Sequence, residues 1–112
     1  MLPRKSLVPL KKEFGRIRSS GKMYDAPSFG LLVDFEAKTG PQAAFVVSKK
    51  INRSSVIRHQ VKRKLADAVA FFLPRLPKNM ELVFLAKQKA VDGTVDQLKA
   101  EIESVLKRGK LL

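Results

Sequence analysis

The clearest pattern along the chain is a set of apolar residues at helical spacing near its middle. Within residues 57–72 they recur at intervals of four, four, three and four, which places them on one face of an α-helix. Ser54 or Ser55 can cap the start of this helix by accepting a backbone N–H. We expect the helix to end near Leu73, because Pro74 cannot continue it. The apolar residues are Ile57, Val61, Leu65, Ala68 and Phe72.

Two apolar stretches before this helix are typical of β-strands. They are residues 29–35 and 42–48, and the Gly40-Pro41 step between them predicts a turn. Because so short a connection favours neighbouring strands, we expect the two to pair as an antiparallel hairpin. The pattern leaves room for one more short strand around residues 22–26.

The two ends of the chain also carry helical patterns. Residues 10–17 predict a short basic helix that stops at residues 19–21, and residues 95–106 predict a last amphipathic helix that begins after a turn and cap at residues 92–94. Between the central and last helices, residues 80–86 are almost continuously apolar, as expected of a strand buried on both faces. The expected order is helix, strand, strand, helix, strand, helix.

The length of 112 residues predicts a single domain, residues 1–112, with one modest core. Residues 1–9 contain two prolines and are expected to form a flexible arm, and residues 109–112 a flexible tail. The chain has no cysteine, which is compatible with a reducing cytoplasm. We expect neither a secretory signal nor a membrane-spanning helix, which needs about 20 apolar residues.

Charge changes the picture more than any other bulk property. The formal net charge is +13, from 23 basic and 10 acidic residues, and the basic residues are clustered. This balance predicts binding to a polyanion, with nucleic acid first and an anionic membrane second, against the plainer alternative of a solvated basic surface. Seven cations with no intervening acid occupy one run, namely Lys49, Lys50, Arg53, Arg58, Lys62, Arg63 and Lys64.

No set of residues suggests catalysis or metal binding by the protein itself. The single histidine, His59, has no acid beside it in sequence, and the carboxylates are scattered rather than grouped as a two-metal nuclease requires. We therefore expect no catalytic residue and no metal ligand in this chain. The sequence predicts a protein that binds nucleic acid rather than one that cuts it unaided.

These residues together resemble the protein component of bacterial ribonuclease P over nearly the whole chain. That family carries Ser/Ala-Lys-Lys at a strand end, then a loop, then a helix whose signature begins Arg-Asn-Arg and continues to a Lys-Arg pair; here residues 48–50 and 58–63 correspond. His59 and Gln60 replace the usual Asn and second Arg, so the chain resembles a divergent member. The Phe14-bearing basic helix followed by Gly21-Lys22 also matches.

The resemblance implies an α+β fold, a ribosomal-protein-S5-domain-2-like α/β sandwich with a left-handed β-α-β crossover around the basic helix. It implies that an RNA subunit, with Mg²⁺ bound mainly by that RNA and none held by the protein alone, removes the 5′ leader of precursor tRNA. The protein would bind this RNA, most simply 1:1, and hold the leader in a cleft between sheet and first helix. The alternative is a ribosomal or general RNA-binding protein without a processing role. A DNA-binding helix-turn-helix protein fits poorly, because it needs helices in succession and here predicted strands flank the central helix.

The resemblance also assigns residues. Those expected to contact the catalytic RNA are Lys49, Lys50, Arg53, Arg58, His59, Gln60, Lys62 and Arg63. Those expected to line the leader cleft are Phe14, Ile17, Arg18, Phe29 and Leu32.

Overall fold

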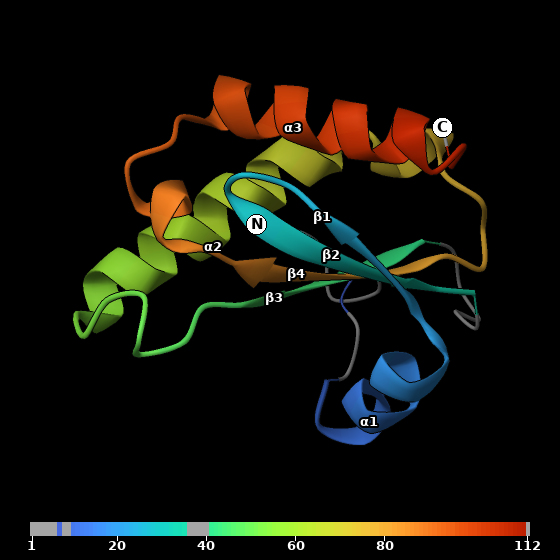
Figure 1. Ribbon diagram of the computed structural model, residues 1–112, viewed down its shortest axis with the longest axis horizontal. Helices are drawn as coiled ribbons and strands as arrows, with labels where there is room; N and C mark the ends of the chain where they lie inside the picture. The colour runs from blue at the N-terminus through green and yellow to red at the C-terminus, as the bar shows by residue number, and fades with distance from the viewer. Residues whose placement is uncertain (1–6, 8–9, 36–40, 112) are drawn as a thin grey trace.

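The computed structural model describes residue 7, residues 10–35 and residues 41–111, and of residues 10–13 it describes the backbone alone. In this part of the chain three α-helices pack on a four-stranded sheet (Figure 1). The predicted helices and strands are confirmed, including the short additional strand, and two 3₁₀ turns follow α2 and β4. The elements are α1 (Leu10–Ser20), β1 (Lys22–Asp25), β2 (Phe29–Asp34), β3 (Gln42–Val46), α2 (Ser55–Ala70), η2 (Leu73–Arg75), β4 (Glu81–Ala86), η3 (Gln88–Val91) and α3 (Val95–Arg108).

The order of the strands is β1-β2-β4-β3, so the predicted hairpin between β2 and β3 is wrong. β4 lies between them, antiparallel to β2 and parallel to β3, and the hairpin forms between β1 and β2 instead. The reason is that β4 is apolar on both faces and is best buried with a neighbour on each side. The parallel strands β3 and β4 are joined through α2, which gives the β-α-β unit that the resemblance implies.

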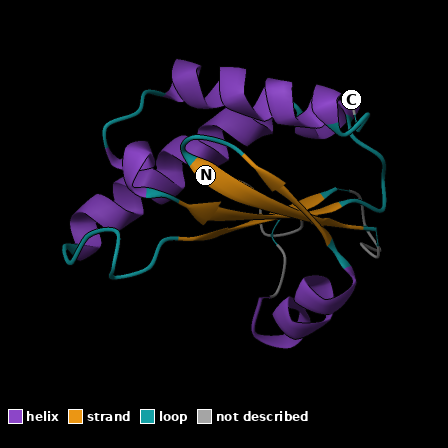
Figure 2. Cartoon of the chain, in the orientation of Figure 1, coloured by secondary structure: helices purple, strands orange, loops and turns teal. Residues whose placement is uncertain are grey.

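Helices cover both faces of the sheet, α2 and α3 on one side and α1 on the other (Figure 2). Side chains along β2 alternate between the two faces of the sheet. Phe29 and Leu31 face the larger core under α2 and α3, whereas Leu32 faces α1. In the larger core the Phe84 ring meets Phe29 edge-on at 5.2 Å and stacks with Phe45 at 5.6 Å between ring centroids. Beneath α1, the smaller core is formed by Ile17, Leu32, Ala44 and Val83.

The helix caps lie where the sequence places them. Ser54 Oγ accepts a hydrogen bond of 3.3 Å from the Ile57 amide at the start of α2. Thr94 and Gln97 form a reciprocal capping box at the start of α3. α2 ends at Ala70, a little before the expected Leu73, because the chain tightens into the 3₁₀ turn η2 around Pro74.

Parts of the expected arm and tail contact the folded body. Leu7 forms a parallel β-bridge with Ala43 at the free edge of β3. At the other end of the chain, the Leu111 amide donates a hydrogen bond of 2.8 Å to the Leu106 carbonyl oxygen. Both leucines are partly buried against the larger core. Residues 1–6, 8–9 and 112 of these segments, and residues 36–40 of the predicted turn, lie outside the described residues.

The step from α1 to β1 requires glycine at position 21. A Cβ there would lie 2.9 Å from the Val33 carbonyl oxygen and even closer to that of Ile17, and neither backbone atom can move away cheaply. We expect Gly21→Ala to lower the free energy of unfolding by about 2–3 kcal/mol in urea titrations. Gly15→Ala is the matched control: nothing lies within 4 Å of its Cβ position in α1, so it should raise stability by about 0.5–1 kcal/mol. Equal stability of the two variants would contradict the explanation.

Candidate nucleic-acid interface

A basic surface is formed by the loop after β3 and the first half of α2; its residues are Lys49, Lys50, Arg53, Arg58, Lys62 and Arg63. α2 buries Val61 and Leu65 against the larger core, and Arg63, between them, lies on the opposite side of the helix. Arg63, His59 and Gln60 are exposed and Lys62 is half-buried. The structure therefore brings the residues predicted to bind the catalytic RNA onto one loop and the helix that follows it.

Arg58 has a role that the sequence did not reveal. Its Nη1 donates a hydrogen bond of 3.0 Å to the Asn52 carbonyl oxygen and one of 2.8 Å to the Arg53 carbonyl oxygen. The Asn52 side chain in turn accepts a 2.9 Å hydrogen bond from the Ser54 amide. Arg58 thus fixes the loop that carries Arg53, in addition to adding its own charge to the basic surface.

Lys64, the last cation of the sequence run, points away from the basic surface into the protein. Its ammonium donates to the carbonyls of Ala90, Val91 and Gly93 at 2.9, 2.9 and 2.8 Å. Burial lowers the pKa of Lys64, and the nearby Asp92 carboxylate opposes that effect. Because its three donors are used inside the protein, Lys64 ties α2 to the segment between β4 and α3 rather than offering a charge to a ligand.

The predicted leader-cleft residues separate into different environments. Ile17 and Leu32 are buried beneath α1, Phe14 is half-buried against them, and Arg18 is exposed. Phe29 cannot line that cleft, because its ring is fully buried on the opposite face of the sheet. The error comes from the alternation of strand side chains: Phe29 is an odd number of residues from Leu32.

An apolar face beside α1 contains residues that the sequence reasoning missed. It consists of Phe14, Met23, Val46 and Leu85. Met23 is 53% exposed and stands opposite Leu32 across the β1–β2 pair. Gly30 has no side chain on this face, and the Met23 sulfur packs against it, 3.5 Å from where a Cβ at that position would be. Side chains alternate between the two faces of each strand, so the sequence shows which residues of one strand share a face. Which residues of different strands lie together follows only once the strand order is known.

Neither a metal site nor a membrane-spanning helix is found among the described residues. No three histidine, aspartate or glutamate side chains there gather closely enough to hold a metal ion. No helix in the same part of the chain is both long and apolar enough to cross a membrane.

Comparisons with known proteins agree on one family. The family model described as Ribonuclease P matches residues 2–110. The ribonuclease P protein component of Caldanaerobacter subterraneus subsp. tengcongensis is 36% identical over 118 residues, covering 96% of this chain and 94% of the relative. That of Chloroflexus aurantiacus is 28% identical over 102 residues, covering 90% of this chain and 75% of the relative.

Solved structures share the fold. The RNase P protein of Staphylococcus aureus superposes with a TM-score of 0.80 at 22% identity, covering 95% of this chain and 96% of that structure. The RNase P protein of Thermotoga maritima gives a TM-score of 0.79 at 19% identity, covering 91% and 96%. These likenesses confirm the expected fold class. The match of the family model over residues 2–110, together with the relative that is 36% identical, shows that this chain belongs to the ribonuclease P protein family.

Proposed function

We propose that this chain acts as the protein subunit of ribonuclease P by binding two RNAs on two adjoining surfaces. The basic surface would bind the catalytic RNA, and the apolar face beside α1 would hold the 5′ leader of precursor tRNA. The observation that carries the proposal is their adjacency: the chain passes from Val46 on the apolar face to Lys49 on the basic surface within a few residues.

The basic surface has the chemistry that a folded RNA requires. The guanidinium groups of Arg53 and Arg63 can each donate two parallel hydrogen bonds to a phosphate, and the lysines act as point charges. His59 and Gln60 stand on the same exposed side of α2 and can form hydrogen bonds with sugar or base edges. The loop fixed by Arg58 needs little further ordering, which reduces the entropic cost of binding.

The apolar face suits a short single strand. The half-buried Phe14 ring offers a surface for an unpaired base, and stacking of this kind is worth roughly 1–3 kcal/mol per base whatever the sequence. The Arg18 side chain is exposed on the same helix and can meet a leader phosphate. Because precursor and mature tRNA differ in the leader, a grip on the leader favours substrate over product.

We assign the cleavage itself to the RNA subunit, with Mg²⁺ held there. Cations of the basic surface would lie between phosphate groups of the two RNAs and offset their repulsion, so less Mg²⁺ should be needed. The simplest assembly is one protein with one RNA, in the cytoplasm, where precursor tRNA is made.

The proposal is tested by leader cleavage of a precursor tRNA with the ribonuclease P RNA of the same organism at low Mg²⁺. Adding the wild-type protein should raise kcat/KM by about tenfold or more, since even one additional stacked base contributes on the order of a factor of ten. Polylysine at equal total charge is the control for unspecific screening. Stimulation by polylysine alone, or by neither, would contradict a specific role for this chain.

A further inference from the structure

Two carboxylates lie opposite each other at one end of the sheet. Asp34, the last residue of β2, pairs in register with Glu81, the first residue of β4. Their side chains are only 12% and 3% exposed, respectively. Like charges directly opposed across strands are destabilising, and burial increases the cost of an unpaired carboxylate.

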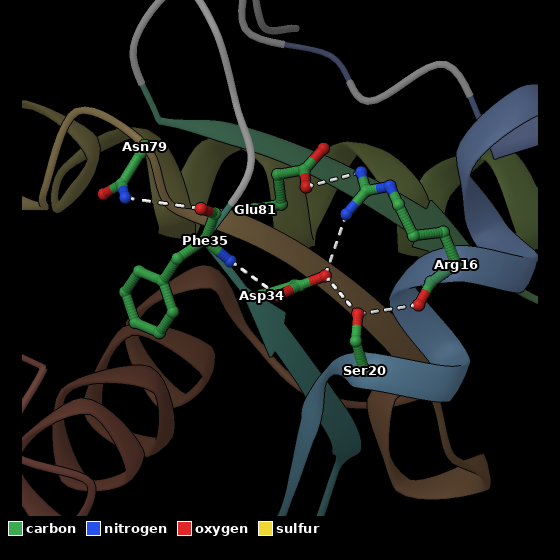
Figure 3. A network of polar contacts seen from close by, with 6 residues as sticks. All are labelled: Arg16, Ser20, Asp34, Phe35, Asn79 and Glu81. Carbon is green, nitrogen blue, oxygen red and sulfur yellow. Dashed lines mark hydrogen bonds and ion pairs between the residues drawn. The ribbon is translucent and has the colours of Figure 1, made fainter.

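Arg16 of α1 bridges this pair (Figure 3). Its Nη1 lies 2.9 Å from Asp34 Oδ2, and its Nη2 lies 2.8 Å from Glu81 Oε1. The two nitrogens of the planar guanidinium are held at a fixed spacing, so contact with both carboxylates defines the position of the Arg16 side chain in two directions. A lysine ammonium, as a single point charge, would define it less closely.

A second contact from α1 reaches the same carboxylate. Ser20 Oγ lies 2.7 Å from Asp34 Oδ2 and 2.9 Å from the Arg16 carbonyl oxygen. Asp34 Oδ1 accepts a 2.8 Å hydrogen bond from the Phe35 amide, so both oxygens of the carboxylate have donors. The last turn of α1 is therefore tied to the sheet at Asp34 and Glu81, as the close view shows (Figure 3).

Phe14 lies on the same helix and depends on this attachment. It packs beside Ile17, whose side chain is buried in the smaller core, while Arg16 projects from the flank of the helix toward the carboxylates. Apolar packing of Ile17 alone would permit α1 to slide or rotate on the sheet. The ion pairs of Arg16 with Asp34 and Glu81 fix the orientation of α1, because they require a particular geometry. The position of the Phe14 ring over the sheet is thus set partly by a contact to which that ring contributes nothing.

We propose that Arg16 is a positioning residue for the leader: by joining Asp34 and Glu81 it sets how α1 lies on the sheet, and so where Phe14 meets the leader. This inference rests on the proposed function. Arg16 acts through α1 and has no part in binding the catalytic RNA, since the basic surface lies on α2 and the loop before it.

The test compares variants in the reconstituted RNA–protein complex. The dissociation constants for precursor and mature tRNA are measured for wild type, Arg16→Gln, and the triple variant Arg16→Gln, Asp34→Asn, Glu81→Gln. Arg75→Gln, which removes an exposed arginine next to Phe71, is the matched control. Protein affinity for the catalytic RNA and unfolding in urea are measured in parallel.

Arg16→Gln should reduce the preference for precursor over mature tRNA about fivefold to tenfold, with less than about a twofold change in affinity for the catalytic RNA. Arg16→Gln should also lower stability, because it leaves the Asp34 and Glu81 carboxylates opposed without their arginine. The triple variant should regain that stability, because both charges are gone, but it should not regain the preference for precursor tRNA. Arg75→Gln should behave as wild type.

Two outcomes would overturn the inference alone: an unchanged preference in Arg16→Gln, or a triple variant that recovers preference together with stability, as a purely structural role predicts. A wild-type complex that binds precursor and mature tRNA equally would overturn the proposed function, and this inference with it.

Discussion

Replacing Lys62 and Arg63 together by alanine is expected to weaken binding of the ribonuclease P RNA about 100-fold at about 0.1 M salt. Each lost phosphate contact should cost about 1.4 kcal/mol, which is a factor of about ten. The loss should fall on RNA binding and not on folding, because Arg63 is exposed and Lys62 half-buried, and the apolar face of α2 is untouched.

The salt dependence gives this prediction its sharpest form. A plot of log affinity against log salt should lose about two units of slope in the double variant, one for each phosphate contact. The matched control removes one lysine and one arginine elsewhere, as Lys107→Ala with Arg75→Ala, both exposed and outside the basic surface. If the control loses as much slope as the double variant, net charge rather than the basic surface governs binding.

Lys64→Met is expected to lower the free energy of unfolding by about 3 kcal/mol. The substitution keeps the aliphatic stem but removes the ammonium that donates to Ala90, Val91 and Gly93. Carbonyls left without a donor in a half-buried place cost about 1–3 kcal/mol each, and relaxation toward water recovers part of that. Urea unfolding measures the change.

Arg63→Met is the control for this substitution, because it places the same side chain next door on the exposed side of α2. It should change stability by less than about 0.5 kcal/mol. Lys64→Met should also leave the RNA salt slope close to wild type once folded, since that ammonium is turned inward. A stable Lys64→Met protein with a reduced slope would mean that Lys64 contacts RNA.

Local signals in the sequence were sufficient for the elements. The apolar positions of 57–72 and 95–106, the caps at Ser54 and Thr94, and the breaking effect of Pro74 act over a few residues, so they can be read without knowing the fold. The clustering of cations from Lys49 onward is of the same kind, because a helix and its leading loop keep sequence neighbours together in space. The family resemblance drew on these same local features.

The tertiary structure decided what depends on residues far apart in sequence. The insertion of β4 between β2 and β3 follows from its need for neighbours on both sides, and the Gly40-Pro41 step gives no sign of that insertion in the sequence. Strand order then determines which side chains share a face, which places Met23 with Leu85 on the apolar face beside α1 and puts Phe29 on the opposite face of the sheet.

Charges show the same division most clearly. The sequence by itself determined that this protein is strongly basic and where the cations cluster, because charge and helical spacing are properties of neighbouring residues. Only the fold decided that Lys64 turns inward to three carbonyls and that Arg16 meets two carboxylates brought together from β2 and β4. The physical reason is that an ion pair or a hydrogen bond requires its partners within about 3–4 Å, a distance that chain folding sets and sequence separation does not.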